Sequence, residues 1–258
     1  MKSGHVRDHP KFRPLIRDLT QNRVLAYKHS YDVFRDWIGA MHAFLFHLDH
    51  GVDEMKKELD RHTAKEGKEL ARMMTEYFHI VEDYQFHDVL GAIFMEIEVA
   101  SVRAGQFFTP WQICLLMAEL NFDRWGFDAI LEENGYVTVC DPATGSGAML
   151  LAYAHVVKKT CGPAALRKVK FYGQDVDLRC VHMARIQLRT NGLDSFGNMV
   201  RLFTEGDQYE PFPGASYTQS SRSTHRAGTT DIPPVEKSTN HGATGVVGTQ
   251  DLLPFDQD

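Results

Sequence analysis

The feature that most restricts the fold is a glycine-rich turn between a β-branched run and an apolar helical run. Residues 136–140 (YVTVC) predict a short strand, the segment Asp141–Gly147 (DPATGSG) follows directly, and residues 148–157 predict a helix. Glycines at such a turn let backbone N–H groups approach a ligand closely and let the helix pack tightly on the strand. The free N–H groups at the helix start also favour an anionic group.

The same alternation continues along the chain. A second strand is predicted at residues 169–172, a second helix at residues 179–190, and a third strand at residues 199–203. Strands that alternate with helices indicate β-α-β units, in which the strands are parallel and the crossovers right-handed. We therefore expect an α/β fold with a Rossmann-like sheet that stops after three strands.

The sequence divides into three parts. We predict a helical N-terminal domain over residues 1–103, because apolar residues recur at spacings of three and four and proline is absent between Leu15 and Phe108. The Rossmann-like domain is predicted over residues 104–212. Residues 213–258 are rich in Ser, Thr, Gly and His and poor in large apolar residues, so they are predicted to be a disordered polar tail.

Two acidic residues follow the second and third predicted strands. Asp175, in the segment Gly173–Asp177 (GQDVD), is placed to accept hydrogen bonds from the hydroxyls of a ribose. Asp207, after the third strand, is placed to reach an adenine amino group. A glycine loop and two acids at three successive strand ends indicate a nucleoside site, and the alternative is ordinary turn chemistry at each strand end.

Four segments together carry a family resemblance. They are Asp88–Glu96 (DVLGAIFME), Gly105–Pro110 (GQFFTP), Asp141–Gly147 and Gly173–Asp177. In this order they resemble the adenine-specific N6 DNA methyltransferases. Within that family the chain looks like the modification subunits of type I restriction-modification systems and their short relatives on phages and conjugative elements. The resemblance covers roughly residues 30–210 and implies a Rossmann-like domain that binds S-adenosyl-L-methionine.

The resemblance also implies the cofactor-binding residues. In that family, the Phe-Thr-Pro segment covers the methionine end of S-adenosyl-L-methionine. The glycine loop and the acid after the second strand hold the adenosine, and the acid after the third strand contacts the adenine. These residues are Phe108, Thr109, Pro110, Asp141, Pro142, Thr144, Gly145, Gly147, Asp175 and Asp207. Thr144 stands where the family usually has cysteine or a similar small residue. For Phe108, packing at the domain junction is the alternative role.

One family motif is missing. The catalytic tetrapeptide Asn/Asp-Pro-Pro-Tyr/Phe is expected on a fourth strand, but the only echo is Asp231–Val235 (DIPPV), which has an inserted isoleucine and no aromatic residue. Two functions therefore stay open. One is a DNA adenine-N6 methyltransferase, which works on DNA with a specificity or methyltransferase subunit as partner. The other is a non-catalytic accessory or decoy protein that binds the cofactor and associates with restriction-modification partners.

Composition limits the binding partners and the cellular location that we expect for the protein. The 34 acidic and 28 basic residues give a net charge of −6, so a basic DNA-binding surface must be local or come from a partner. The four cysteines have no C-x-x-C spacing, and the offsets among His42, His47 and His50 do not form an i, i+4 metal pair. The start MKSGHVRDHP lacks an apolar core, and no apolar window is long enough to span a bilayer. We expect a soluble cytoplasmic protein without a metal site.

Overall fold

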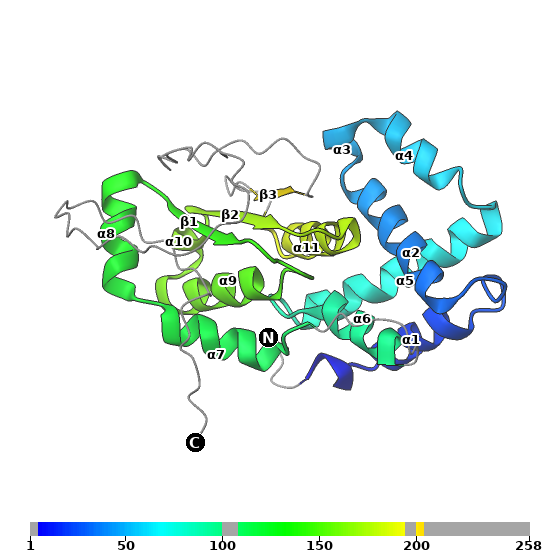
Figure 1. Cartoon of the computed structure of the whole chain (residues 1–258), viewed down its shortest axis with the longest axis horizontal. Coiled ribbons are helices and arrows are strands. Elements are labelled where there is room, and N and C mark those ends of the chain that lie inside the picture. Colours follow the sequence, from blue (N-terminus) through cyan, green and yellow to red (C-terminus); the bar gives the residue numbers. More distant parts are fainter. Residues whose placement is uncertain (1–4, 100–107, 194–199, 204–258) are drawn as a thin grey trace, which may run out of the picture.

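The structure of the chain, a computed structural model, describes residues 5–99, 108–193 and 200–203 (Figure 1). Several predicted features lie outside these residues: Gly105–Phe107 of the Phe-Thr-Pro motif, Asp207, and residues 213–258 with the Pro-Pro echo. None of the helices in the described ranges is both long and apolar enough to span a membrane.

Residues 6–99 form only helices, as the apolar periodicity predicts. The elements are the 3-10 helix η1 (Val6–Asp8), α1 (Phe12–Gln21), α2 (Ser30–Leu45), α3 (His47–His50), α4 (Val52–Leu59), α5 (Ala64–Asp83) and α6 (Val89–Val99). Helix α5 begins with a capping box: the Glu66 N–H donates to Thr63 Oγ1 over 3.3 Å, and the Thr63 N–H donates to the Glu66 carboxylate over 2.7 Å.

The second half alternates strands and helices around a parallel sheet. Its elements are α7 (Trp111–Asn121), α8 (Arg124–Asn134), β1 (Val137–Asp141), α9 (Ala148–Cys161), α10 (Pro163–Leu166), β2 (Val169–Gln174), α11 (Leu178–Thr190) and β3 (Val200–Phe203). Strand β2 pairs in parallel with β1 on one side and with β3 on the other. The predicted α/β fold class and the three predicted strands are confirmed.

Two helices of this half are not predicted by periodicity. Helix α7 is apolar on most of its circumference, so its sequence has no single apolar stripe. Helix α8 carries its signals only at its ends: the Asp123 side chain accepts from the Trp125 and Gly126 N–H groups, and Gly135 ends the helix in the left-handed conformation.

The three histidines His42, His47 and His50 lie on two helices. Phe46 separates α2 from α3, and its ring is buried. The His42 ring stacks on Phe46 and on His182 of α11, with the His42 and His182 ring centroids 4.0 Å apart. Burial lowers the pKa of His182 to about 4. His42 is therefore an interfacial histidine between α2 and α11.

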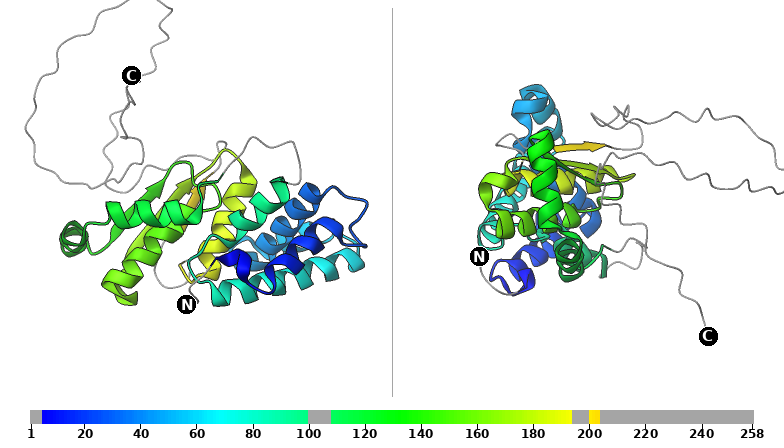
Figure 2. Two further views of the ribbon diagram at one scale, coloured as in Figure 1. Left: turned by 90° about the horizontal axis from the view of Figure 1, so that it is seen from below. Right: turned by 90° about the vertical axis from the view of Figure 1, so that its left-hand side faces the viewer.

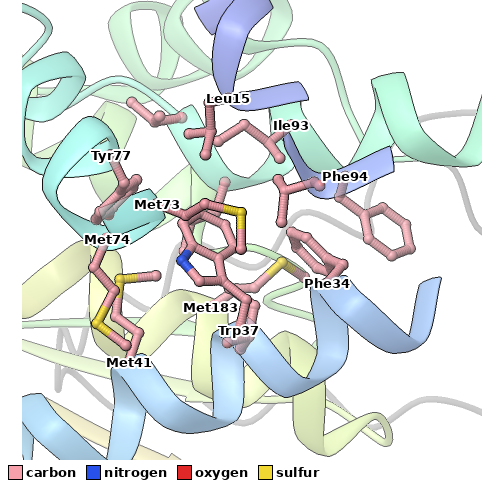
Figure 3. Packing of buried hydrophobic residues seen from close by; sticks show 14 of the residues in the cluster. Leu15, Phe34, Trp37, Met41, Met73, Met74, Tyr77, Ile93, Phe94 and Met183 are labelled. Carbon is pink, nitrogen blue, oxygen red and sulfur yellow. The ribbon is translucent and has the colours of Figure 1, made fainter. Parts of the chain in front are cut away.

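The main hydrophobic cluster joins the two halves of the chain. Its centre is Trp37, which is fully buried among side chains of α2, α5 and α11, including Met73, Tyr77 and Met183 (Figure 3). Helix α11 contributes Cys180, Met183 and Ile186 to this cluster, and it runs between the N-terminal helices and the sheet (Figures 1 and 2). The N-terminal helices are therefore packed directly on the strand-containing half.

We expect Met183→Ala to lower the free energy of unfolding by about 2–5 kcal/mol, because it leaves a cavity in the cluster that joins the two halves. Denaturant unfolding followed by circular dichroism measures this change. Leu48→Ala is the matched control: the Leu48 side chain is 84% exposed, so its loss should change the free energy by no more than about 0.5 kcal/mol. Equal changes in the two variants would contradict the shared core.

Candidate cofactor-binding site

The glycine loop Asp141–Gly147 lies over the carboxyl ends of β1 and β2. Asp141 pairs with Gly173 in the strand register, and the Thr144 N–H donates to the carbonyl of Gln174 over 2.9 Å. The loop closes on itself through a 2.8 Å bond from the Gly147 N–H to the Thr144 carbonyl. Open parallel sheets bind ligands beyond the carboxyl ends of their strands, so this loop stands where a ligand is expected.

Both glycines of the loop have backbone conformations that side chains disfavour. Gly145 has φ +53° and Gly147 has φ +91°. A Cβ atom at Gly147 would lie 3.1 Å from the Cα atom of Ala184 on α11, and a Cβ atom at Gly145 would lie 3.2 Å from the Phe108 ring. The glycines therefore allow the loop to pack closely between α11 and Phe108.

Asp175 lies directly against this loop. Its carboxylate accepts the Gly145 N–H over 2.9 Å and the Asp177 N–H over 2.9 Å. The side chain is half-buried. A carboxylate has about four acceptor positions, so capacity remains for a hydroxyl donor from a ligand. The glycine loop and the predicted ribose-binding acid are thus brought into contact.

Asp141 provides a second carboxylate at the same edge of the sheet. It accepts the Ala143 N–H over 3.1 Å, within the turn that contains the exposed Pro142. Burial raises the pKa of Asp141, and the negative charge of Asp175 raises it further. The edge therefore favours ligands that donate hydrogen bonds or carry positive charge.

The starts of two helices meet at this edge. The N-cap of α9 is Gly147, and no side chain of the described residues bonds to the start of that helix. By contrast, the Asp177 carboxylate caps α11 by accepting the Arg179 N–H over 2.9 Å, and it also pairs with the Arg179 guanidinium. The first turn of α9 is therefore the helix start left to a ligand anion.

The three residues of the Phe-Thr-Pro segment line one cavity, and Phe108 also packs at the junction of the two halves. The half-buried Phe108 ring packs on Phe94 of α6, with centroids 5.0 Å apart, and borders Gly145. Thr109 and Pro110 are exposed before α7 and line a cavity of about 260 Å³ together with Asp88. Phe108 therefore has the junction contact expected from packing and also borders the loop. Whether Thr109 and Pro110 cover a ligand stays a prediction.

The loop has a buried polar underside that the sequence analysis does not identify. Ser146 Oγ donates to Asp88 over 2.9 Å, and Gln187 Nε2 donates to the Ser146 carbonyl over 2.7 Å and to Asp88 over 2.8 Å. The Thr144 side chain is also buried, and its Oγ1 has no hydrogen-bond partner within the described ranges. The one sequence signal for this arrangement is Gln187, a polar residue between two apolar residues of α11. Its side chain is fully buried in the structure.

The described residues contain no group of three or more His, Cys, Asp or Glu side chains that could hold a metal ion. All four cysteines are free, and two of them, Cys114 and Cys180, are buried. Burial raises the pKa of both thiols to about 12, so neither is a reactive thiolate at neutral pH.

Comparison with known proteins finds a family whose pattern matches part of the chain. The sequence pattern of the family described as N-6 DNA Methylase matches residues 86–201, and this match confirms the resemblance predicted from the motifs. The matched range contains the glycine loop, Asp175 and the buried Asp88–Gln187 contact. No curated protein sequence matches the chain significantly.

Two solved structures are similar to the chain. One is a proposed class I S-adenosylmethionine-dependent methyltransferase from Listeria monocytogenes, at 16% identity and a TM-score of 0.41, covering 75% of this chain and 53% of that one. The other is the type I restriction-modification system methyltransferase subunit from Streptococcus thermophilus, at 19% identity and a TM-score of 0.34, covering 79% and 42%. The chain thus spans about half the length of the structures it matches.

The close packing of the loop predicts a large difference between two glycine-to-alanine substitutions. Gly147→Ala should lower the free energy of unfolding by about 1–3 kcal/mol, because its backbone conformation and its contact with Ala184 both exclude a side chain. Gly67→Ala should raise the free energy by about 1 kcal/mol, because Gly67 is inside α5 and open space surrounds it. Denaturant unfolding of both variants checks the prediction, which fails if Gly147→Ala is neutral.

Proposed function

We propose that the loop Asp141–Gly147 and Asp175 bind S-adenosyl-L-methionine. The observation that carries this proposal is the 2.9 Å contact between the Gly145 N–H and the Asp175 carboxylate at the carboxyl edge of the sheet. It brings a glycine loop with close backbone access next to an acid with free acceptor capacity, which is the pairing that an adenosine ribose requires. The match of residues 86–201 to the N-6 DNA Methylase family supports the same ligand.

The remaining groups of the edge fit the other parts of this cofactor. The uncapped start of α9 suits the carboxylate of the methionine portion, and the two carboxylates Asp141 and Asp175 suit its ammonium and hydroxyl donors. We assign Phe108, Thr109 and Pro110 to the methionine end and Asp207 to the adenine amino group, as the family resemblance implies. Pro142 and Thr144 shape the loop.

The reaction that we propose is N6 methylation of adenine in DNA. Held by the loop Asp141–Gly147 and Asp175, the cofactor would supply an electrophilic methyl group on its sulfonium, and the exocyclic nitrogen of adenine would be the acceptor. The contribution of this chain is to hold the cofactor edge rigid, because catalysis here is chiefly positioning. With a net charge of −6, the chain depends on a partner, such as a specificity or methyltransferase subunit, for much of its DNA contact.

A second function is favoured by one feature of the sequence. The only Pro-Pro pair lies in Asp231–Val235, which lacks the aromatic residue that stacks on a flipped base in the family's catalytic motif. A chain that binds the cofactor without transferring the methyl group would act as an accessory or decoy protein for restriction-modification partners. The two functions share the cofactor site and differ in methyl transfer.

We predict that Asp175→Ala weakens S-adenosyl-L-methionine binding by about 1.5–3 kcal/mol, because the ribose hydroxyls lose a charged acceptor. Isothermal titration calorimetry measures the binding, and thermal unfolding verifies that the variant is folded. Asp53→Ala is the control, since Asp53 is exposed on α4 and belongs to no part of the site. Equal affinity in the native protein and the Asp175 variant would remove Asp175 from the site.

Radiolabelled methyl transfer to adenine-containing duplex DNA separates the two functions. Label that enters DNA with the native chain, or with a partner subunit added, and is lost with Asp175→Ala supports the methyltransferase. Cofactor binding without transfer under both conditions supports the accessory function. If the native chain binds no cofactor, both functions are wrong.

A further inference from the structure

A buried polar cluster lies beneath the glycine loop and is not part of the proposed ligand contacts. Its members are Asp88, Ser146 and Gln187, which are 6%, 1% and 0% exposed. They come from three separate places in the chain: the residue before α6, the middle of the glycine loop, and the third turn of α11. The cluster therefore links the N-terminal helices to both elements that border the candidate site.

Every side-chain N and O atom of this cluster has a hydrogen-bond partner. The Asp88 carboxylate accepts from Ser146 Oγ, from Gln187 Nε2 and from the Gly91 N–H, over 2.9, 2.8 and 2.9 Å. Gln187 Nε2 also donates to the Ser146 carbonyl over 2.7 Å, and Gln187 Oε1 accepts the Leu90 N–H over 2.9 Å. Burial raises the pKa of Asp88, and these donors oppose that shift. A buried carboxyl group without such donors would be strongly destabilising.

The cluster acts on the one loop residue that stands between the two glycines. Asp88 holds the Ser146 side chain, and Gln187 holds the Ser146 carbonyl, so both ends of this residue are fixed from below. Gly145 and Gly147 have no side chains that could fix the loop themselves. Their backbone freedom has to be removed by other contacts if their N–H groups are to keep a constant place.

We propose that Asp88 and Gln187 are positioning residues that hold the glycine loop in its cofactor-binding conformation through Ser146. The proposal rests on the proposed function for the identity of the ligand. The Asp88 carboxylate and the Gln187 amide are bonded to Ser146, Gly91 and Leu90, so they act on the cofactor through the loop. Because Asp88 also begins α6, a shift of the N-terminal helices would loosen the loop and lower cofactor affinity.

Hydrogen exchange of the full chain without ligand tests the positioning role directly. In Asp88→Ala, the amides of Gly145 and Gly147 should exchange about tenfold faster, as expected for the loss of hydrogen bonds to a buried charged group. Asp88→Asn should exchange at nearly the native rate, because its amide oxygen still accepts from Gly91 and Gln187, and its amide nitrogen can donate to Ser146 Oγ with the bond direction reversed. Gln187→Met, which preserves the side-chain volume, replaces Asp88→Ala in this test if that variant does not fold. It should also raise the exchange rate of the Gly145 and Gly147 amides.

Asp36→Ala is the matched control for lost stability. Asp36 is 8% exposed and pairs with Lys28 over 2.8 Å within the N-terminal helices, so its removal disrupts a comparably buried carboxylate away from the loop. This variant should lower the melting temperature but leave the loop exchange at the native rate. If Asp36→Ala accelerates loop exchange as much as Asp88→Ala does, the effect is general destabilisation and the proposal is wrong.

Calorimetry with S-adenosyl-L-methionine completes the experiment. The dissociation constant should rise about tenfold in Asp88→Ala and Gln187→Met and stay near the native value in Asp88→Asn and Asp36→Ala. Native loop exchange in both disruptive variants, or faster exchange with unchanged affinity, overturns the positioning role. If the native chain binds no cofactor, the proposed function fails, and the exchange rates alone still decide whether the cluster holds the loop.

Discussion

Helix α11 has two faces buried in different hydrophobic clusters, and the arrangement of the chain depends on this double burial. Met183 and Ile186 are packed among the N-terminal helices, whereas Leu188 is packed with Val169 and Phe171 of the sheet. Burial of three such side chains contributes several kcal/mol, roughly 1.5–3 each. Because α11 follows the acid-bearing end of β2 and touches the glycine loop at Ala184, the same packing also sets the geometry of the candidate site.

The site is consequently shared between the two halves of the chain. Gly145 and Asp175 lie in the turns that follow β1 and β2, but Phe108 packs on Phe94 of α6, and Ser146 is held by Asp88, the residue before that helix. A Rossmann-like half alone would lack these supports. The helical half therefore has a second role besides stability, which is to keep a glycine-rich loop in one conformation while its upper surface stays open to a ligand.

Much of this arrangement can be predicted from the sequence, where local patterns decide the structure. The β-branched run before Asp141 and the glycines after it indicate β1, the loop and α9, and the acid at Asp175 indicates the ribose position. Long-range packing escapes such patterns. Helix α7 has no single apolar stripe, because Ile113, Leu116 and Leu120 are apolar and yet exposed, while Cys114 and Ala118 are packed against α9. The bonds of Gln187 to Asp88 and Ser146 join residues far apart in the chain.

The most direct test of the account is an NMR titration of the isotope-labelled chain with S-adenosylhomocysteine, followed at the backbone amides of the loop. A ribose that binds Asp175 must change the environment of the Gly145 N–H, which donates to the same carboxylate. We predict saturable shifts at Gly145 and Gly147, whereas amides inside α5 stay in place. Saturable binding that leaves the Gly145 amide unshifted would contradict the assignment of this edge as the cofactor site.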